Sequence, residues 1–355
     1  MSRPTGGFIR NCWYVAGWAH EVGATTPLAR RLLGEPVVLF RTAEGTPVAL
    51  RDACAHRLAP LSAGRVEAHG LRCLYHGVVF DAQGVAVEVP GQPQVPPQLR
   101  VPSYPLVERD NLLWIWMGDP ALADASRIPH IPALDDPAWP MKPGTMHFRA
   151  HYQLVLDNLL DFSHLSYVHP GTVGGTTQIA MARPRVERTA EGVHIERWVF
   201  DVPAAPFQAR VGGFAGNVDR WHRYDVLLPG LMIMESGVQP TGTGAVEGRH
   251  EGALRFRPVN LVTPESATTT HYFYALPHDF ALGDEAVNEQ LFADLTQAFD
   301  EDRVIIEAQQ RVIDDLAATG AVPPMAALAA DTALGHLRWM IERRLQAEAL
   351  QPVAG

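Results

Sequence analysis

Short apolar runs dominate the first third of the chain. They are rich in Val, Leu, Ile and Trp, and Gly, Pro, Asn or Asp separates them, which is typical of β-strands joined by turns. The clearest runs are PVVLFRT (36–42), PVALRDAC (47–54), VVFDAQGVAVEV (78–89) and NLLWIWMG (111–118). In the third run, Gly84 occupies the tight position of a predicted hairpin. The pattern therefore predicts an all-β domain.

The pattern changes after residue 118. Residues 118–144 carry six prolines, which indicates an irregular connection. We place the domain boundary in this connection and predict a first domain over residues 1–120 and a second over 121–355.

The second domain mixes helices with strands. Residues 147–169 are apolar on nearly all sides and precede Pro170-Gly171, which predicts one buried helix. Strand-like runs return between about residues 178 and 280. A long amphipathic helix is predicted over residues 284–318, and a shorter helix over 333–350. The fold class is therefore predicted to be α+β.

Composition narrows the setting of the protein. The 355 residues have a formal net charge of −10, which argues against nucleic acids and anionic membranes as partners. No apolar run approaches the ~20 residues that span a bilayer, and the N-terminus lacks a signal-peptide pattern. Three cysteines are too few for a disulfide framework. We expect a cytoplasmic protein.

Two Cys/His pairs carry the first candidate chemistry. Cys54-x-His56 is followed, after sixteen residues, by Cys73-x2-His76. Zinc fingers usually pair Cys with Cys and His with His. Mixed pairs on two loops of a β-domain favour a Rieske-type [2Fe–2S] cluster, in which two cysteines hold one iron and two histidines the other. A zinc site and chance spacing remain as alternatives, and His69 is expected to be a surface histidine.

His164 and His169 carry the second candidate chemistry. Imidazoles in a nearly all-apolar helix are costly unless they are hydrogen-bonded or bound to metal. Two histidines and a carboxylate are the usual ligands of a non-haem Fe(II) that activates O2. On an ideal helix the two side chains point about 140° apart, so His169 should lie where the helix ends. A pair of hydrogen-bonded core histidines is the alternative.

The third ligand is sought in the acidic cluster of Asp300, Glu301 and Asp302. At about 100° per residue, Asp302 falls in the middle of an apolar stripe, Asp300 on the opposite face and Glu301 to the side. The stripe is formed by Leu291, Leu295, Ala298, Ile306 and Ile313. A carboxylate in a core-facing stripe needs a compensating charge, which iron would supply. A buried salt bridge to an arginine is the alternative for Asp302.

These segments together resemble the bacterial Rieske non-haem iron oxygenases. The resemblance is carried by RDACAHRLAPLSAGRV, CLYHG, DNLLDFSHLSYVHP and FDEDRVIIEAQQ. Val78 departs from the Trp that many members have after YHG, which we interpret as a packing change. The resemblance implies an N-terminal all-β Rieske domain and a helix-grip-like catalytic domain with a curved antiparallel sheet and helices. It also implies two cofactors, the [2Fe–2S] cluster and a mononuclear Fe(II).

The resemblance further implies roles for two polar residues. Asp161 would connect His164 with His76 of the next chain in a head-to-tail homotrimer. Asn158 would hydrogen-bond near the iron, although an ordinary polar contact on the helix explains it nearly as well.

In function, the chain looks most like the branch of vanillate O-demethylase and toluenesulfonate methyl-monooxygenase oxygenase components. That branch implies monooxygenation of a methyl or methoxy carbon on a small, acidic aromatic substrate with O2. No nucleotide fingerprint occurs, so a separate NAD(P)H-dependent reductase or ferredoxin, with flavin and [2Fe–2S], is expected to deliver electrons. A ring-hydroxylating dioxygenase, a Rieske electron-transfer protein and a zinc-stabilised binding module remain as alternatives.

The substrate pocket is expected on the strands between residues 200 and 280. Arg220, His222 and Arg223 could bind a carboxylate or a sulfonate there, although arginines on a strand are usually solvated.

Overall fold

Two compact units make up the computed structural model, which describes residues 7–320 and 322–350. The first is built mainly from Phe8–His130 and also takes in Thr263–Ala267. The second is built mainly from Ile131–Val262 and Thr268–Ala347. The domain boundary after residue 120 stays a prediction.

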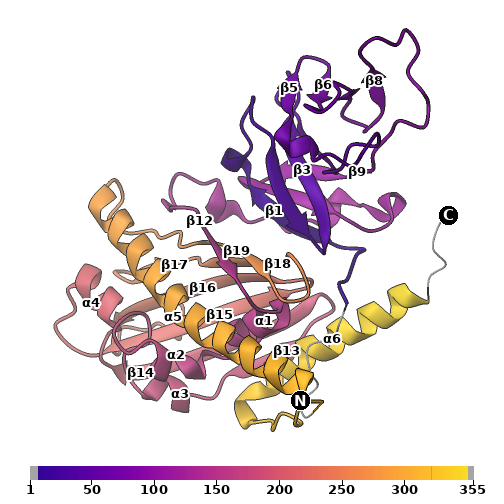
Figure 1. Cartoon of the computed structure of the whole chain (residues 1–355). Coiled ribbons are helices and arrows are strands. Elements are labelled where there is room, and N and C mark those ends of the chain that lie inside the picture. The colour runs from indigo at the N-terminus through magenta and orange to yellow at the C-terminus, as the bar shows by residue number, and fades with distance from the viewer. Residues whose placement is uncertain (1–6, 321, 351–355) are drawn as a thin grey trace. The chain divides into compact units, whose positions relative to one another are not determined.

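In its described residues, the first unit contains three small antiparallel sheets (Figure 1). In spatial order, one holds β1 (Trp13–Trp18), β11 (Leu112–Trp116) and β10 (Leu106–Arg109). The next holds β2 (Leu28–Leu32), β3 (Glu35–Arg41), β4 (Pro47–Arg51) and β9 (Ser103–Tyr104). The last holds β5 (Arg65–Glu67), β6 (Gly70–Arg72), β7 (Val79–Phe80) and β8 (Ala86–Glu88). The predicted strands are confirmed, and the hairpin at Gly84 turns with φ +76°.

The second unit is organised around an eight-stranded sheet. Its spatial order is β12-β19-β18-β16-β15-β14-β13, and β17 pairs with β16 beside β18. The strands are β12 (Gly144–Phe148), β13 (Arg185–Arg188), β14 (Gly192–Val202), β15 (Val218–Leu227), β16 (Leu231–Pro240), β17 (Leu254–Phe256), β18 (Val259–Pro264) and β19 (Thr270–Ala275). The antiparallel pairs β14–β15 and β15–β16 run along nearly the full length of these strands, so their side chains alternate between the two faces of the sheet.

Helices cover this sheet, and the longest, α5 (Glu285–Ala318), runs across it in Figure 1. The remaining helices are α1 (Tyr152–Leu160), α2 (Leu165–Val168), α3 (Gln178–Met181), α4 (Pro206–Gly212) and α6 (Thr332–Ala349). Asp284 caps α5 by accepting the N–H groups of Ala286 and Val287. The predicted stripe on α5 is buried from Leu291 to Ile306 and only half-buried at Ile313. The two helices predicted at the end of the chain are thus confirmed.

The single helix predicted over residues 147–169 is wrong. Residues 144–148 form β12, and α1 ends before Asp161, whose backbone is extended (φ −129°, ψ 104°). The Asp161 carboxylate accepts the Ser163 N–H at 2.9 Å and so caps a new 3₁₀ turn. Aspartate offers the backbone this alternative to helical hydrogen bonds, which the apolar pattern does not reveal. The helix therefore restarts after Asp161, and it ends again at His169, where the sequence predicted the end.

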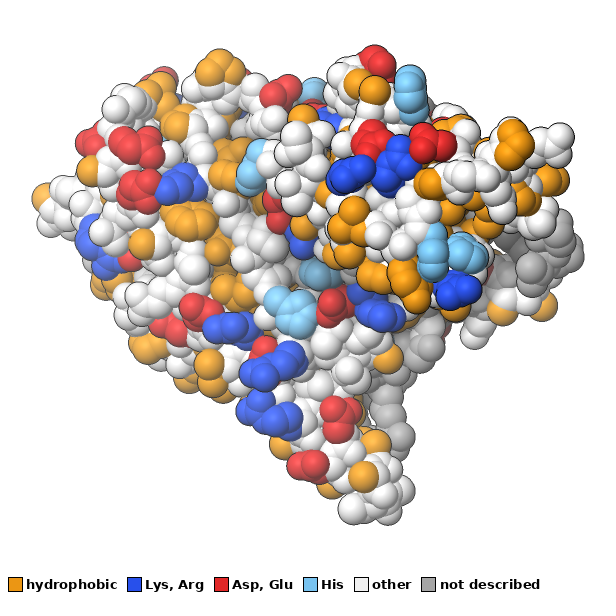
Figure 2. Space-filling view, turned by 45° about the horizontal axis from the view of Figure 1, so that its top comes forward, with side chains coloured by type: hydrophobic (Ala, Val, Ile, Leu, Met, Phe, Trp, Pro, Cys, Tyr) orange, Lys and Arg blue, Asp and Glu red, His pale blue; other side chains and the backbone are white. Residues whose placement is uncertain are grey.

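Charged side chains of both signs are interspersed on the face drawn in Figure 2, where basic groups stand beside acidic or hydrophobic ones rather than in one broad field. Within residues 7–320 and 322–350, no helix has the length and apolar character that crossing a membrane requires.

The packing of β15 against β16 gives a first prediction. Trp221 is fully buried and lies directly opposite Gly237 in the sheet. A Cβ on Gly237 would stand 2.0 Å from the Trp221 ring. Gly237→Ala should therefore destabilise the fold by about 1–3 kcal/mol and lower the thermal unfolding midpoint.

The control is Gly335→Ala in α6, an exposed helix position with nothing within 4 Å of the added methyl group. Alanine favours a helix by about 1 kcal/mol over glycine, so this variant should unfold at the same or a higher temperature. Equal midpoints for Gly237→Ala and the parent protein would contradict the packing described.

Candidate metal centres

The two Cys/His pairs lie on loops of the same construction. In each loop, the cysteine N–H donates to the carbonyl five residues later, and the cysteine carbonyl accepts the N–H four residues later. These bonds, of 2.8–3.0 Å, are Cys54 N to Ala59 O, Leu58 N to Cys54 O, Cys73 N to Val78 O and Gly77 N to Cys73 O. Both loops turn through a left-handed residue, Leu58 (φ +57°) or Gly77 (φ +76°). The shared geometry presents one cysteine and one histidine from each loop.

The four side chains separate by burial. Cys54 and Cys73 are only 2% and 1% exposed, whereas His56 and His76 are exposed, with ring centroids 4.5 Å apart. Both cysteines are free thiols. Burial, together with the neighbouring Cys73 thiol, raises the pKa of Cys54. Two buried sulfurs and two neighbouring imidazoles match the donor set of a Rieske cluster.

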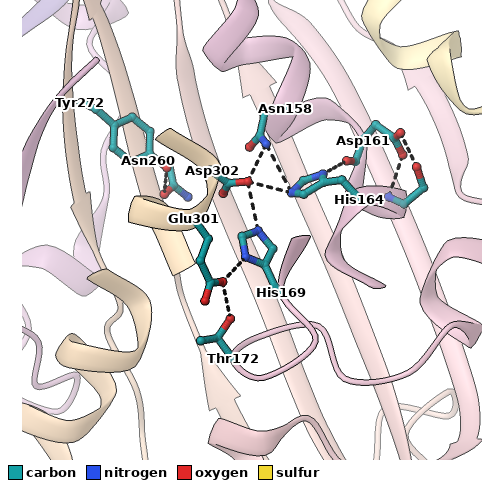
Figure 3. A network of polar contacts seen from close by, with 10 residues as sticks. Asn158, Asp161, His164, His169, Thr172, Asn260, Tyr272, Glu301 and Asp302 are labelled. Atoms are coloured by element: carbon teal, nitrogen blue, oxygen red, sulfur yellow. Dashed lines mark hydrogen bonds and ion pairs between the residues drawn. The ribbon is translucent and has the colours of Figure 1, made fainter. Parts of the chain in front are cut away.

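A second donor set gathers in the other unit. The ligand atoms of His164, His169 and Asp302 all lie within 4.8 Å of one another. Figure 3 shows both imidazoles pointing at Asp302, which α5 contributes from the opposite side. Asp302 Oδ1 is 3.0 Å from His169 Nε2 and 3.4 Å from His164 Nε2. Two imidazoles and one carboxylate gathered in this way fit a mononuclear non-haem iron.

Each imidazole is held by its other nitrogen. His164 Nδ1 donates to the main-chain carbonyl of Asp161 at 2.5 Å, and His169 Nδ1 donates to Glu301 Oε2 at 2.7 Å. Because the Asp161 carbonyl and the Glu301 carboxylate can only accept, Nδ1 carries a proton in both rings. Nε2 is therefore the nitrogen with which each ring would bind a metal.

The break at Asp161 brings the two histidines together. Their ring centroids are 5.3 Å apart, although a continuous helix would turn them about 140° away from each other. Because a 3₁₀ turn precedes α2 and His169 follows its last residue, both rings reach the same carboxylate.

The surroundings shift the pKa values of the two histidines in opposite directions. Burial lowers the pKa of His164. Burial also acts to lower the pKa of His169, but the Asp302 and Glu301 carboxylates outweigh it and raise that pKa. Asp302 itself is 5% exposed, and among the described residues its ion pairs are with these two histidines and not with an arginine.

Asn158 and Asp161 flank the triad. The Asn158 amide donates to Asp302 Oδ1 at 2.8 Å, and its nitrogen lies 3.4 Å from His164 Nε2. The Asp161 carboxylate was expected to accept from His164, but the main-chain carbonyl does so instead. The Asp161 carboxylate instead accepts hydrogen bonds from Ser163 and lies 3.5 Å from Arg197 Nη2. This difference follows from the helix break, which turns the side chain back to cap the next turn.

Sequence reasoning missed Glu301. Helical phase placed it to the side of the apolar stripe, yet it holds His169 and accepts the Thr172 hydroxyl at 2.9 Å. The sequence signal that could have identified Glu301 is its position next to Asp302, at the edge of the apolar stripe on α5. From there its side chain reaches His169. Asp300 behaves as expected, since it is half-exposed and pairs with Arg303.

The triad forms part of the wall of a pocket that encloses about 800 Å³ of space, some of it open to solvent. The pocket lies between the sheet and helices α1, α4 and α5, and apolar side chains such as Phe162, Met232, Met234 and Phe299 line much of it. A largely apolar lining with a few polar side chains is typical of a site for a small organic molecule. The substrate pocket was expected on the strands between residues 200 and 280. These strands form one wall of it, and the helices form the others.

Comparisons with known proteins agree with both centres. The Rieske [2Fe-2S] domain family matches residues 12–105, and the vanillate O-demethylase oxygenase C-terminal domain family matches residues 148–347. The toluene-4-sulfonate monooxygenase system iron-sulfur subunit of Comamonas testosteroni is 45% identical over 96% of this chain and 98% of its own length.

Solved structures show the same fold. Dicamba monooxygenase bound to dicamba has a TM-score of 0.88 at 33% identity, covering 97% of this chain and 100% of that chain. The same enzyme with non-haem iron and dicamba has a TM-score of 0.80 at 32% identity, covering 96% and 98%. The predicted fold class is confirmed: a β-rich N-terminal domain, then a domain with an antiparallel sheet and helices.

The contact between Glu301 and His169 gives a second prediction. Glu301→Ala removes the acceptor that orients the ring, and loss of such a partner typically weakens metal binding about 10–100-fold. Titration of Fe(II) into chelator-treated protein should show this loss, with the visible absorption of the cluster unchanged. Asp300→Ala, one residue earlier and half-exposed, should bind Fe(II) as the parent does. Equal affinities for both variants would contradict the role of Glu301.

Proposed function

The chain belongs to the Rieske oxygenases that carry a vanillate O-demethylase oxygenase C-terminal domain, and we propose that it oxidises a methyl or methoxy group on a small aromatic compound. It is an enzyme, the oxygenase component of a multicomponent monooxygenase. The observation that carries the proposal is the pocket in which the triad and an apolar wall face the same space.

The cofactors are a Rieske [2Fe–2S] cluster and a mononuclear non-haem iron. When bound, they supply single-electron transfer and activation of O2, respectively. The proposed cluster ligands are Cys54, His56, Cys73 and His76, supported by the matching hydrogen bonds of their two loops. The proposed iron ligands are His164, His169 and Asp302, supported by their converging donor atoms.

The surrounding residues keep the iron ligands in place. Asn158 donates to Asp302 and so fixes the orientation of its carboxylate. Glu301 and the Asp161 carbonyl hold the two imidazoles with Nε2 toward the metal position. Phe162 and Phe299 line the same pocket as these ligands and add to its apolar wall.

Asp161 is the proposed link for electrons that arrive from the cluster. Its carboxylate is 20% exposed, and its own carbonyl oxygen contacts His164. We place a Rieske histidine of a neighbouring subunit against it, in a head-to-tail homotrimer. Family resemblance and this partial exposure support the arrangement.

The substrate and electron source follow from the relatives. Their names give toluene-4-sulfonate and dicamba as aromatic substrates, and the first is described as one subunit of a system. We propose a methyl- or methoxy-substituted aromatic acid for this chain and a separate NAD(P)H-dependent reductase, with or without a ferredoxin. One O2, two electrons and two protons convert a methyl group to a hydroxymethyl group and water. A hydroxylated methoxy group then releases formaldehyde and leaves a phenol.

The proposed ligand role of His164 gives a third prediction. His164→Ala should remove the mononuclear iron, so the iron content falls from three to two per chain, and turnover is lost because O2 is no longer activated. The visible spectrum of the cluster should stay. His69→Ala, at an exposed loop position, is the control and should retain three irons and full activity. Turnover by His164→Ala would refute the assignment.

The reaction is tested with the iron-loaded enzyme, NADH and a surrogate reductase. Methyl- and methoxy-substituted benzoates and benzenesulfonates are screened for substrate-dependent O2 uptake, with formaldehyde measured for the methoxy compounds. We expect at least one compound to give product in proportion to O2. A protein with three irons per chain that shows no substrate-dependent uptake with any of them would contradict the proposed substrate class.

A further inference from the structure

Arg220 is a buried cation without an acidic partner. It lies on β15, is 2% exposed and lines the same pocket as the triad. Among the described residues, no ion pair joins it to a carboxylate. Burying an unpaired guanidinium is unfavourable, so such a group is normally matched by an anion.

Part of the guanidinium is used by the protein itself. Nη1 donates to the Gly174 carbonyl at 2.8 Å and Nη2 to the Val173 carbonyl at 3.0 Å. The buried Nε has no hydrogen-bond partner. A guanidinium has five N–H groups, so N–H donors of Arg220 remain available to a ligand after these two bonds. Carbonyl dipoles hold the group in place but do not neutralise its charge.

The acid next to Arg220 in sequence does not reach it. Asp219 points to the other face of the sheet, where its carboxylate accepts the N–H groups of Asp201 and Gly242. Burial lowers the pKa of Arg220 to about 10, so the group remains protonated at neutral pH. Arg220 therefore brings to the lining of the pocket a positive charge that no carboxylate of the described residues neutralises.

His222 extends this polar spot along the same face of β15. It is 7% exposed, lines the pocket, and its buried Nδ1 has no partner. Burial and the charges of Arg220 and Arg197 keep its pKa well below the usual value, so the ring is neutral and can donate one hydrogen bond. Ser236 lies directly opposite on β16 and also lines the pocket.

We propose that Arg220, with His222 beside it, binds the anionic group of the substrate, a carboxylate or a sulfonate. This inference rests on the proposed function and names the side chains that select an acidic aromatic. The N–H groups of a guanidinium can donate to two oxygens of either anion. With the anion held at β15, the aromatic ring lies against the apolar wall of the pocket that the triad shares.

Arg220 could instead serve only to hold the Val173–Gly174 loop, which follows the ligand His169. The two roles predict different effects of replacing Arg220 on ligand affinity. If Arg220 binds the anion, only anionic molecules lose affinity; if it only holds the loop, anionic and neutral molecules lose affinity equally.

Binding is measured by calorimetry without O2 or reductase, using matched pairs of probes. The pairs are 4-toluenesulfonate with toluene-4-sulfonamide, and 4-toluate with 4-methylbenzamide. The parent protein should prefer at least one anion over its neutral partner by about tenfold or more. Arg220→Gln should weaken binding of that anion about 10–100-fold and leave the amide unchanged, and Arg220→Lys should restore part of the preference.

The control variant is Arg223→Gln. Arg223 lies on the same strand, is 35% exposed and pairs with Glu196. Its loss should therefore leave the binding affinity unchanged for both the anion and the amide. Iron content is measured for every variant. Equal binding of anion and amide by the parent protein overturns the inference, even if Arg220→Gln fails to fold. A loss of equal size for both probes in a variant that keeps three irons also overturns it.

These outcomes are separable from the proposed function. An anion preference that depends on Arg220 stands even if no compound is oxidised. Oxidation of neutral and anionic compounds with equal KM would preserve the oxygenase and reject the anion site.

Discussion

The buried carboxylate of Asp302 is the constraint on which the second unit depends. It lies in the middle of the apolar face of α5, and its partners are two imidazoles and the amide of Asn158. None of these carries a fixed positive charge, so the group needs a cation. A bound iron would supply it, and the helix break at Asp161 turns both histidines toward the same oxygen, where they would share that metal.

The three candidate binding positions share one physical feature: each buries chemical groups that the protein leaves without full compensation. Two buried thiols lie on loops that carry two neighbouring imidazoles, one buried carboxylate contacts two more imidazoles, and one buried guanidinium has no acidic partner among the described residues. The cluster, the mononuclear iron and the proposed substrate anion would supply what these positions lack. Imidazoles recur in both proposed ligand sets, and an imidazole that binds iron as a neutral ligand adds no negative charge to it.

Much of this arrangement was predictable because a few residues stand where their residue type is unusual. Two of the three cysteines stand close to histidines in a cysteine-poor chain, and helical phase together with the family resemblance separated Asp302 from Asp300. The break at Asp161 was not predictable from the apolar pattern, since it depends on a side chain capping its own backbone. Glu301 was missed because its partner, His169, is distant in sequence, and phase shows only which face a residue occupies. Arg220 was identified as a candidate, but its missing counter-charge is visible only in three dimensions.

The most direct test of the account is a crystal structure of the purified protein with anomalous data collected at the iron edge. We expect two adjacent iron peaks between the loops of Cys54 and Cys73, and a separate third peak bound by His164, His169 and Asp302. A third peak bound by other side chains, or none beside Asp302 in protein that contains three irons per chain, would contradict the account.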